Sequence, residues 1–232
     1  MDDSVLDNPA WAALTGPHAH FAERAGRAAR YPADMSPWHA LDDPADPAAW
    51  ADAATLAGPG GKITLMGPFD TIPAGWTFFR GVDGVQMAGD GVAVAPDAEA
   101  VVLGPADLPE IADLVQRTDP GPFEPRTVEM GTYLGLRAGG RLVAMAGERL
   151  RPPGWTEISA VCTDPAYRGR GLATRLVRAV AANIRGRGDV PFLHTAAFNT
   201  TAIRLYESMG FTRRGRTRFA SYTTAGAAGT KP

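Results

Sequence analysis

The stretch from Thr156 to Thr174 constrains the fold of this chain more than any other: T-E-I-S-A-V-C-T-D-P-A-Y-R-G-R-G-L-A-T. Its first half is apolar and β-branched and stops at Asp164-Pro165, which predicts a strand and its end. The glycine-rich turn Arg168–Gly171 follows. Beyond it, apolar residues recur every three or four positions, which predicts one buried helix face. The sequence therefore predicts a strand, a glycine-rich turn and a helix in direct succession.

A turn that opens directly into a helix can bind an anion. The first backbone N–H groups of a helix have no partner inside it, and the helix dipole is positive at that end. Gly169 and Gly171 would let the backbone approach a phosphate without an intervening side chain. The alternatives are a tight turn that binds nothing and a dinucleotide-binding turn. The second is disfavoured because Thr174 stands where a third glycine or alanine is needed, and no βαβ repeat surrounds it.

The segment Arg168-Gly169-Arg170-Gly171-Leu172-Ala173 resembles the acyl-CoA motif of the GCN5-related N-acetyltransferases (GNAT). Two longer segments, V-C-T-D-P-A-Y-R-G-R-G-L-A and N-T-T-A-I-R-L-Y-E-S-M-G-F, are similar to the most recognisable parts of that family, in the same order. The resemblance covers roughly 100–223 and is nearest to the FR47-like branch, which is related to glycine N-acyltransferases. It implies an α/β (α+β) GNAT fold, with a central mixed, mostly antiparallel, splayed sheet flanked by helices.

The resemblance also implies the chemistry and the residues that hold the donor. The expected reaction moves an acetyl group from acetyl-CoA to a primary amine by direct attack in a ternary complex. The family's sheet opens between two strands, matched here by Glu157–Thr163 and Phe192–Ala196, and the CoA arm can pair with the first of them like an extra strand. The residues expected to bind acetyl-CoA are Val161, Cys162, Thr163, Arg168, Gly169, Arg170, Gly171, Leu172, Ala173, Thr174, Asn199 and Tyr206.

Three residues are candidates for acid–base catalysis. Tyr206 matches the family's tyrosine that points at the CoA sulfur, and a phenol can protonate the departing thiolate. Glu157 matches the catalytic glutamate of the histone-type members, where a partly buried carboxylate would have a raised pKa. His194 is the rival base, on the strand across the opening. Plainer roles stay open: Tyr206 and His194 as packing residues, and Glu157 as an exposed residue at a strand start. Glu148, on the preceding predicted strand, is a third and weaker candidate for the base.

Charge and cysteine content exclude other classes of protein. A net charge of −2 gives no general attraction to nucleic acid or to an anionic membrane. Cys162 is the single cysteine, so we expect no disulfide framework and a cytoplasmic location. No metal is expected, because the histidines and Cys162 lack ligand spacing. The cluster Arg213, Arg214, Arg216 and Arg218 raises the alternative of an anion- or nucleic-acid-binding module.

We expect residues 1–98 to form an N-terminal α/β domain and residues 99–232 to form the GNAT domain. The N-terminal part is interpreted as a degenerate copy of the same fold. Local patterns predict helices near 9–14, 19–30 and 48–56, and strands at 62–66, 76–80 and 85–87. The oligomeric state stays open.

The acceptor is expected to be a small-molecule amine or an amino acid. This expectation rests on the FR47-like resemblance. The alternatives are a protein N-acetyltransferase and an inactive acyl-CoA-binding regulator. Specificity should lie in loops, which one sequence does not determine.

Overall fold

A computed structural model describes residues 2–67 and 72–224 of the chain. The helices are α1 (Pro9–Leu14), α2 (Pro47–Ala57), α3 (Leu108–Thr118), α4 (Leu172–Gly186) and α5 (Thr200–Ser208). The strands are β1 (Glu23–Ala25), β2 (Ala28–Arg30), β3 (His39–Leu41), β4 (Lys62–Met66), β5 (Trp76–Ala88), β6 (Val101–Leu103), β7 (Tyr133–Ala138), β8 (Arg141–Glu148), β9 (Trp155–Thr163), β10 (Val190–Ala196) and β11 (Thr212–Thr224).

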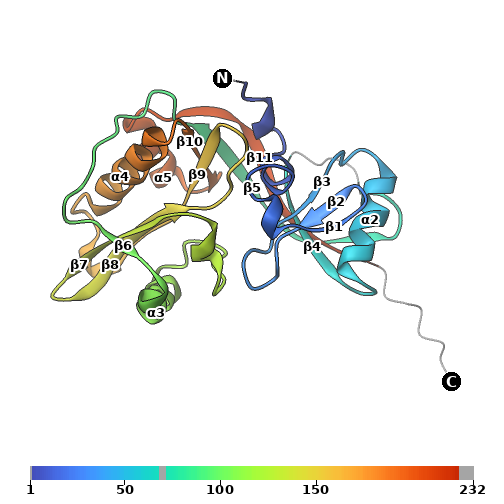
Figure 1. The fold of residues 1–232 in the computed structure, drawn as a ribbon, viewed down its shortest axis with the longest axis horizontal. Helices are drawn as coiled ribbons and strands as arrows, with labels where there is room; N and C mark the ends of the chain where they lie inside the picture. The colour runs from blue at the N-terminus through green and yellow to red at the C-terminus, as the bar shows by residue number, and fades with distance from the viewer. Residues whose placement is uncertain (1, 68–71, 225–232) are drawn as a thin grey trace.

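The core is an eight-stranded sheet in the order β4-β11-β5-β10-β9-β8-β7-β6. All its pairs are antiparallel except β9 with β10, which run parallel. The two longest strands, β5 and β11, cross the middle of the molecule and join its two halves (Figure 1). The fold class expected from the sequence, a mixed and mostly antiparallel sheet flanked by helices, is confirmed.

Side chains alternate between the two faces of a sheet along each strand. Different parts of the chain pack on these two faces. Leu193 and Ile158 belong to one buried cluster with α4 and α5. Phe192 and Trp155 point the other way and belong to a cluster with the N-terminal segment and α1. The helix α3 packs on that second face too, over β8 and β9 (Figure 1). The N-terminal part of the chain thus covers the face opposite α4.

Strand β5 lies between β10 and β11, although those two follow each other in the second part of the chain. Residues 1–98 therefore supply two strands of the large sheet, β4 and β5, and a separate three-stranded sheet β1-β2-β3. This corrects the interpretation of that part as a degenerate copy of the fold: its strands complete one sheet instead of repeating it. The boundary at 98/99 stays a prediction.

The helices and strands that were predicted from capping residues or from alternating hydrophobicity lie where expected. Helix α1 begins as expected, with Asn8 Oδ1 accepting the Trp11 N–H, and α2 and β4 also lie where expected. The helix predicted over residues 19–30 is wrong, because the chain turns at Gly26, whose φ is +49°, and forms the β1–β2 hairpin. The strands predicted at 76–80 and 85–87 merge into β5, since Asp83-Gly84 continues the strand.

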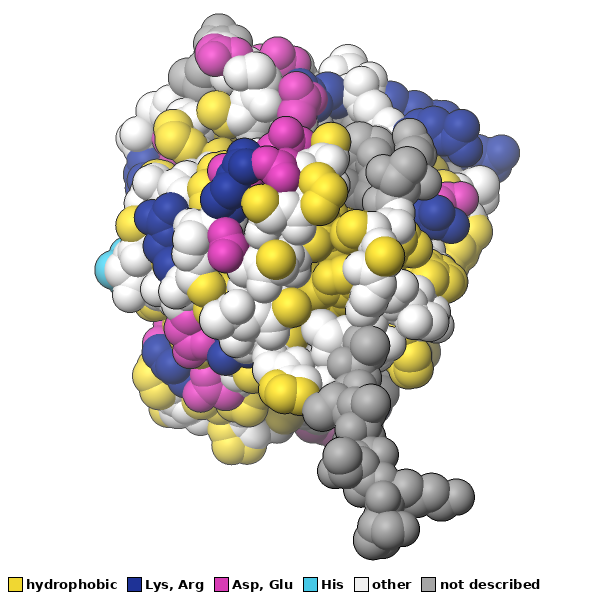
Figure 2. Space-filling model, turned by 90° about the vertical axis from the view of Figure 1, so that its right-hand side faces the viewer, with side chains coloured by type: hydrophobic (Ala, Val, Ile, Leu, Met, Phe, Trp, Pro, Cys, Tyr) yellow, Lys and Arg dark blue, Asp and Glu magenta, His cyan; other side chains and the backbone are white. Residues whose placement is uncertain are grey.

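Figure 2 views the molecule from the side of α2 and β1–β4, where hydrophobic side chains gather on the surface. The outer half of β5 is exposed and carries Phe78, Phe79 and Val82. Within residues 2–67 and 72–224, no helix is long and apolar enough to cross a membrane.

Candidate active site

Strands β9 and β10 pair only over their first halves. Residues Trp155–Ile158 pair with Val190–Leu193, and in the described part of the chain no pair joins the continuations 159–163 and 194–196. The sheet therefore parts at the place expected from the sequence. A bulge marks the same point on β9, where Ala160 has φ of +52° and the register to β8 shifts. Positive φ at an alanine stores strain, a common feature of functional sites.

The glycine-rich turn lies at the far end of β9, and α4 begins directly after it. Gly169 and Gly171 both have φ of +75°, a conformation that favours glycine. Apart from each glycine and the residues on either side of it in the chain, no described atom lies within 4 Å of a Cβ built at either glycine. Packing therefore does not explain these glycines, and the space beside them is open to a ligand. The free N–H groups at the start of α4 fit a phosphate there.

The two arginines of the turn are exposed and stay close to their own loop. Arg168 Nε donates to the Thr163 carbonyl at 3.3 Å, and the Arg170 guanidinium stacks over Tyr167. Asp164 fixes the loop before them, because its Oδ1 accepts the Ala166 N–H at 2.9 Å. The positive charges thus lie beside the helix N-terminus and add to its attraction for an anion.

Tyr206 and Asn199 lie on or next to α5. Asn199 Oδ1 caps the helix by accepting the Ala202 N–H at 3.1 Å, which fits its expected capping role. Tyr206 is buried in the cluster with α4, edge-on to Phe211. Burial raises the pKa of the Tyr206 phenol to about 12, so it stays protonated at neutral pH. Tyr206 thus has a packing role, and its expected role at the CoA sulfur stays a prediction.

Glu157 lies on the opposite face of the sheet from Tyr206 and is fully buried. Burial alone would raise the pKa of its carboxyl, but the charge and hydrogen bonds of Arg149, with a further hydrogen bond from His194, outweigh it and lower the pKa well below the usual range. Two Arg149 nitrogens donate to the carboxylate, Nε at 2.9 Å and Nη2 at 2.8 Å. This corrects the expected raised pKa and excludes the alternative of an exposed residue: Glu157 is a buried carboxylate whose pKa the contact with Arg149 lowers.

His194 joins this pair from β10. Its Nδ1 lies 2.7 Å from Glu157 Oε1 and its Nε2 lies 3.0 Å from Gln86 Nε2. An ionised carboxylate only accepts, so Nδ1 carries the proton and donates it to Glu157. The Gln86 amide nitrogen only donates, so His194 Nε2 is the bare, accepting nitrogen. The network thus assigns a neutral imidazole with its basic nitrogen facing β5.

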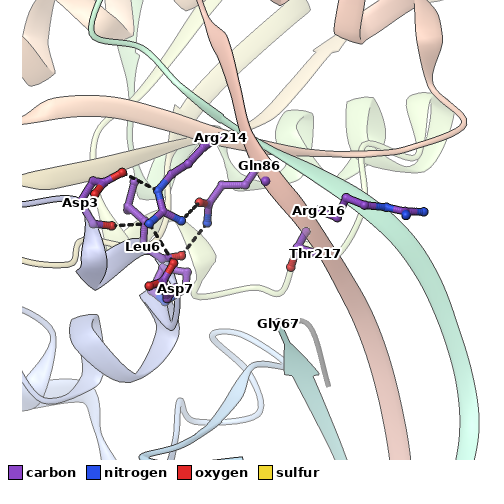
Figure 3. Close-up of a pocket in the computed structure, with 10 residues that line it drawn as sticks. Asp3, Leu6, Asp7, Gly67, Gln86, Arg214, Arg216 and Thr217 are labelled. Carbon is purple, nitrogen blue, oxygen red and sulfur yellow. Dashed lines mark hydrogen bonds and ion pairs between the residues drawn. The ribbon is translucent and has the colours of Figure 1, made fainter. Parts of the chain in front are cut away.

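Gln86 and Arg149 are not among the site residues predicted from the sequence. Gln86 lies on β5, and its amide oxygen accepts from Arg214 Nη1 at 3.0 Å. Arg214 also binds the N-terminal segment, through the side chains of Asp3 and Asp7 (Figure 3). The one available signal for Gln86 was a polar residue between Val85 and Met87 in a predicted strand.

A cavity of about 370 Å³ lies beside this network. Gln86 and Arg214 line it from the sheet, and the N-terminal segment closes one side, as Figure 3 shows. The full lining is Asp3, Leu6, Asp7, Pro9, Gly67, Gln86, Arg214, Gly215, Arg216 and Thr217. The cavity therefore adjoins the side of Gln86 that faces away from β9.

The remaining candidates have structural surroundings. Glu148 is buried and binds Arg187 at 2.9 Å near the end of α4. Burial raises the pKa of the Cys162 thiol, which leaves it a poor nucleophile. The arginine cluster of β11 does not act as one cationic face, because three of its members bind acidic side chains (Arg213, Arg214 and Arg218). This weakens the nucleic-acid alternative.

Comparisons with known proteins agree with this geometry. The family model described as FR47-like protein matches residues 133–220. N-alpha-acetyltransferase RimI of Mycobacterium tuberculosis is 37% identical over 136 residues, which cover 53% of this chain and 85% of that protein. The match to the family model includes the two strands that part, β9 and β10, and the glycine-rich turn after β9. The chain belongs to the GCN5-related N-acetyltransferase family and is an acyltransferase.

Further relatives extend the match to the whole fold. A crystal structure of a protein described as a GNAT-family acetyltransferase from Novosphingobium aromaticivorans is 40% identical, with a TM-score of 0.88, and covers 96% of this chain and 100% of that one. A mycothiol acetyltransferase of Thermobispora bispora is 38% identical over 121 residues, but these span only 39% of that longer protein and 47% of this chain. The first match covers 96% of this chain and therefore extends into its N-terminal part.

Proposed function

We propose that this enzyme transfers an acetyl group from acetyl-CoA to a primary amine of a small molecule or an amino acid, by direct attack in a ternary complex. The observation that carries the proposal is the parting of β9 and β10, with the open turn at Gly169–Gly171 at one end and Tyr206 and His194 on opposite faces. Tyr206 belongs to the buried cluster on one face of the sheet, and His194 lies on the other face beside Glu157.

The donor would be held mainly by backbone. The N–H groups of Gly169 to Thr174 would bind the pyrophosphate, with Arg168 and Arg170 beside it. The edge of β9 at Val161–Thr163 that faces the opening would offer hydrogen bonds to the amides of the pantetheine arm, and the Asn199 side chain would contact the arm as well. Acetyl-CoA supplies the activated acyl group.

His194 is the proposed general base, and Glu157 is its positioning residue. Glu157 remains ionised because of Arg149, so a proton transferred to it would return at once. It can instead hold Nδ1–H of His194 and stabilise the imidazolium that forms when Nε2 takes the amine's proton. Tyr206 would donate its phenolic proton to the departing thiolate. In one turnover His194 gains the proton of the amine, and Tyr206 loses its phenolic proton to the thiolate.

Donor binding is tested by thermal unfolding with and without acetyl-CoA. Wild type should gain stability, by about 2.7 kcal/mol at a hundred times Kd. Gly171→Glu should gain none, because a carboxylate at the turn repels phosphate. Gly186→Glu, at the other end of α4, is the matched control and should respond like wild type. No response from wild type would overturn the donor assignment.

The acceptor is tested by thiol release from acetyl-CoA with a panel of amines: glycinamide, L-lysine, spermidine and a tetrapeptide with a free alanine N-terminus. A second candidate function, protein N-terminal acetylation, is favoured by the match to 85% of RimI. Faster turnover of the tetrapeptide than of every small amine would favour that second function. Turnover of none of the four would contradict the proposed acceptor class.

A further inference from the structure

The side-chain amide of Gln86 is held at all its polar atoms. Its nitrogen donates one hydrogen to the Leu6 carbonyl at 2.8 Å and the other toward His194 Nε2 at 3.0 Å. Its oxygen accepts from Arg214 at 3.0 Å. The bonds to the Leu6 carbonyl and to Arg214 leave one orientation for the amide, since swapping nitrogen and oxygen would break both of them. Gln86 is buried, so each bond matters for its stability.

The bond to His194 occupies the atom that the proposed reaction needs. A base with its lone pair already bound to an N–H cannot take a proton from a substrate at the same time. The Gln86 amide nitrogen therefore lies where an amine nitrogen must lie to give its proton to His194.

The two hydrogen bonds of this nitrogen indicate which chemical group could replace it. A neutral primary amine has two N–H bonds and one lone pair. It could donate one hydrogen to the Leu6 carbonyl and the other to His194 Nε2, and keep its lone pair for the acyl carbon. A secondary amine has one hydrogen fewer and would leave the Leu6 carbonyl without a donor.

We propose that Gln86 is a positioning residue. Its amide nitrogen occupies the position beside His194 Nε2 that the acceptor's primary amine takes when the acceptor displaces it. This inference rests on the proposed role of His194 as base. The cavity of about 370 Å³ adjoins Gln86 and gives the acceptor a way to it (Figure 3). Arg214 and the N-terminal segment set how firmly the amide is held.

The N-terminal segment is built to hold this arrangement. Arg214 donates to Asp3 and Asp7 and to the Asp3 carbonyl, while Trp155 Nε1 donates to the Asp2 carbonyl at 3.1 Å. The segment that carries the Leu6 carbonyl is thus anchored to the sheet at both sides. Loosening the Arg214 anchor should weaken the hold on Gln86 without touching His194 directly.

The test uses the full chain and steady-state kinetics with the panel amine that releases thiol fastest. Gln86→Ala removes the competing N–H, so KM for that amine should fall about 3- to 10-fold, the worth of one exchanged hydrogen bond, while kcat stays within about twofold. Arg214→Ala should shift KM in the same direction. Gln116→Ala, the same change at an exposed glutamine on α3, should leave both constants unchanged.

A second measurement does not depend on turnover. In Gln86→Glu a carboxylate faces Nε2, so ¹⁵N NMR at neutral pH should show both ring nitrogens of His194 protonated, against one in wild type. His194→Ala identifies the signal. Identical ring signals in wild type and Gln86→Glu, or a raised KM in a folded Gln86→Ala, would overturn the proposal. Full activity of His194→Ala would instead overturn the base assignment, whatever Gln86 does.

Discussion

Arg149 and Glu157 form a doubly hydrogen-bonded ion pair inside the protein, with N–O distances of 2.8 and 2.9 Å. The Arg149 guanidinium also lies over the Trp38 ring, 5.4 Å from its centre. Two charges withdrawn from water cost several kcal/mol each, and the pair recovers this only through close geometry. The same carboxylate holds His194. The pair thus links the stability of the fold to the orientation of the proposed base.

The ion pair predicts that stability and activity can be separated. Glu157→Leu leaves Arg149 as an uncompensated buried charge and should lower the free energy of unfolding by about 3–5 kcal/mol. The double variant Arg149→Met/Glu157→Leu should recover most of that loss in urea unfolding. It should not recover thiol release, since His194 has still lost its hydrogen-bond acceptor. A double variant with wild-type kcat would show that Glu157 is only structural.

Tyr206 should behave in the opposite way, with a large effect on rate and a small one on stability. Tyr206→Phe keeps the ring in its apolar cluster and removes only the hydroxyl, so the melting temperature should change little. The rate constant kcat should fall roughly 10²- to 10⁴-fold, the usual contribution of a positioned acid. Tyr222→Phe, at a buried tyrosine of β11, is the matched control. Equal kcat in Tyr206→Phe and wild type would rule out the acid role.

The sequence predicted the parts of the site that lie close together along the chain. The β9–turn–α4 unit follows from a β-branched run, two glycines and a helical period. The capping role of Asn199 and the burial of Tyr206 follow from local spacing. All of these patterns depend on neighbours within a few turns of chain, which a single sequence displays.

The rest depends on contacts between distant segments. Gln86 meets His194 across 108 positions of sequence, and β5 enters the sheet between two strands that follow it by a hundred residues. Nothing in the local pattern of 76–88 specifies these neighbours. The raised pKa expected for Glu157 was wrong for the same reason, because it required knowing that Arg149 lies beside it. Packing between distant segments decides where an arginine of a loop lies and in which order the strands pair. The periodicity of a sequence shows neither.

The insertion of β5 predicts that residues 99–232 do not fold alone. Without residues 1–98, β10 and β11 lose the strand between them, and the apolar face around Trp155 and Phe192 loses its cover. The isolated fragment should show poor dispersion in an amide NMR spectrum and no cooperative melting. Co-expression with 1–98 as a separate chain should restore both. A well-dispersed, cooperatively melting fragment would support the boundary at 98/99 as a true domain boundary.

Acid should destabilise the fold through His18, which lies in the N-terminal cover with its Nδ1 3.0 Å from the Tyr31 hydroxyl. Burial, and then the charges of His20 and Arg151, lower the pKa of His18 to about 4 from 6.5. The unfolded chain therefore binds its proton first as pH falls. Stability is complete above pH 6.5 and declines towards pH 4, by up to about 3 kcal/mol from this group.

Urea unfolding at pH 7.0 and pH 4.5 tests this assignment. The half-buried His39, whose pKa burial also lowers to about 4, contributes a loss of the same sign. His18→Asn keeps an acceptor for the Tyr31 hydroxyl but does not titrate, so its loss between the two pH values should be smaller than that of wild type by about 2–3 kcal/mol. His20→Gln, at the neighbouring exposed position, removes the second of the causes that lower the His18 pKa but leaves its burial, so it should keep most of the wild-type difference. The same pH difference in His18→Asn and wild type would place the acid sensitivity elsewhere in the fold.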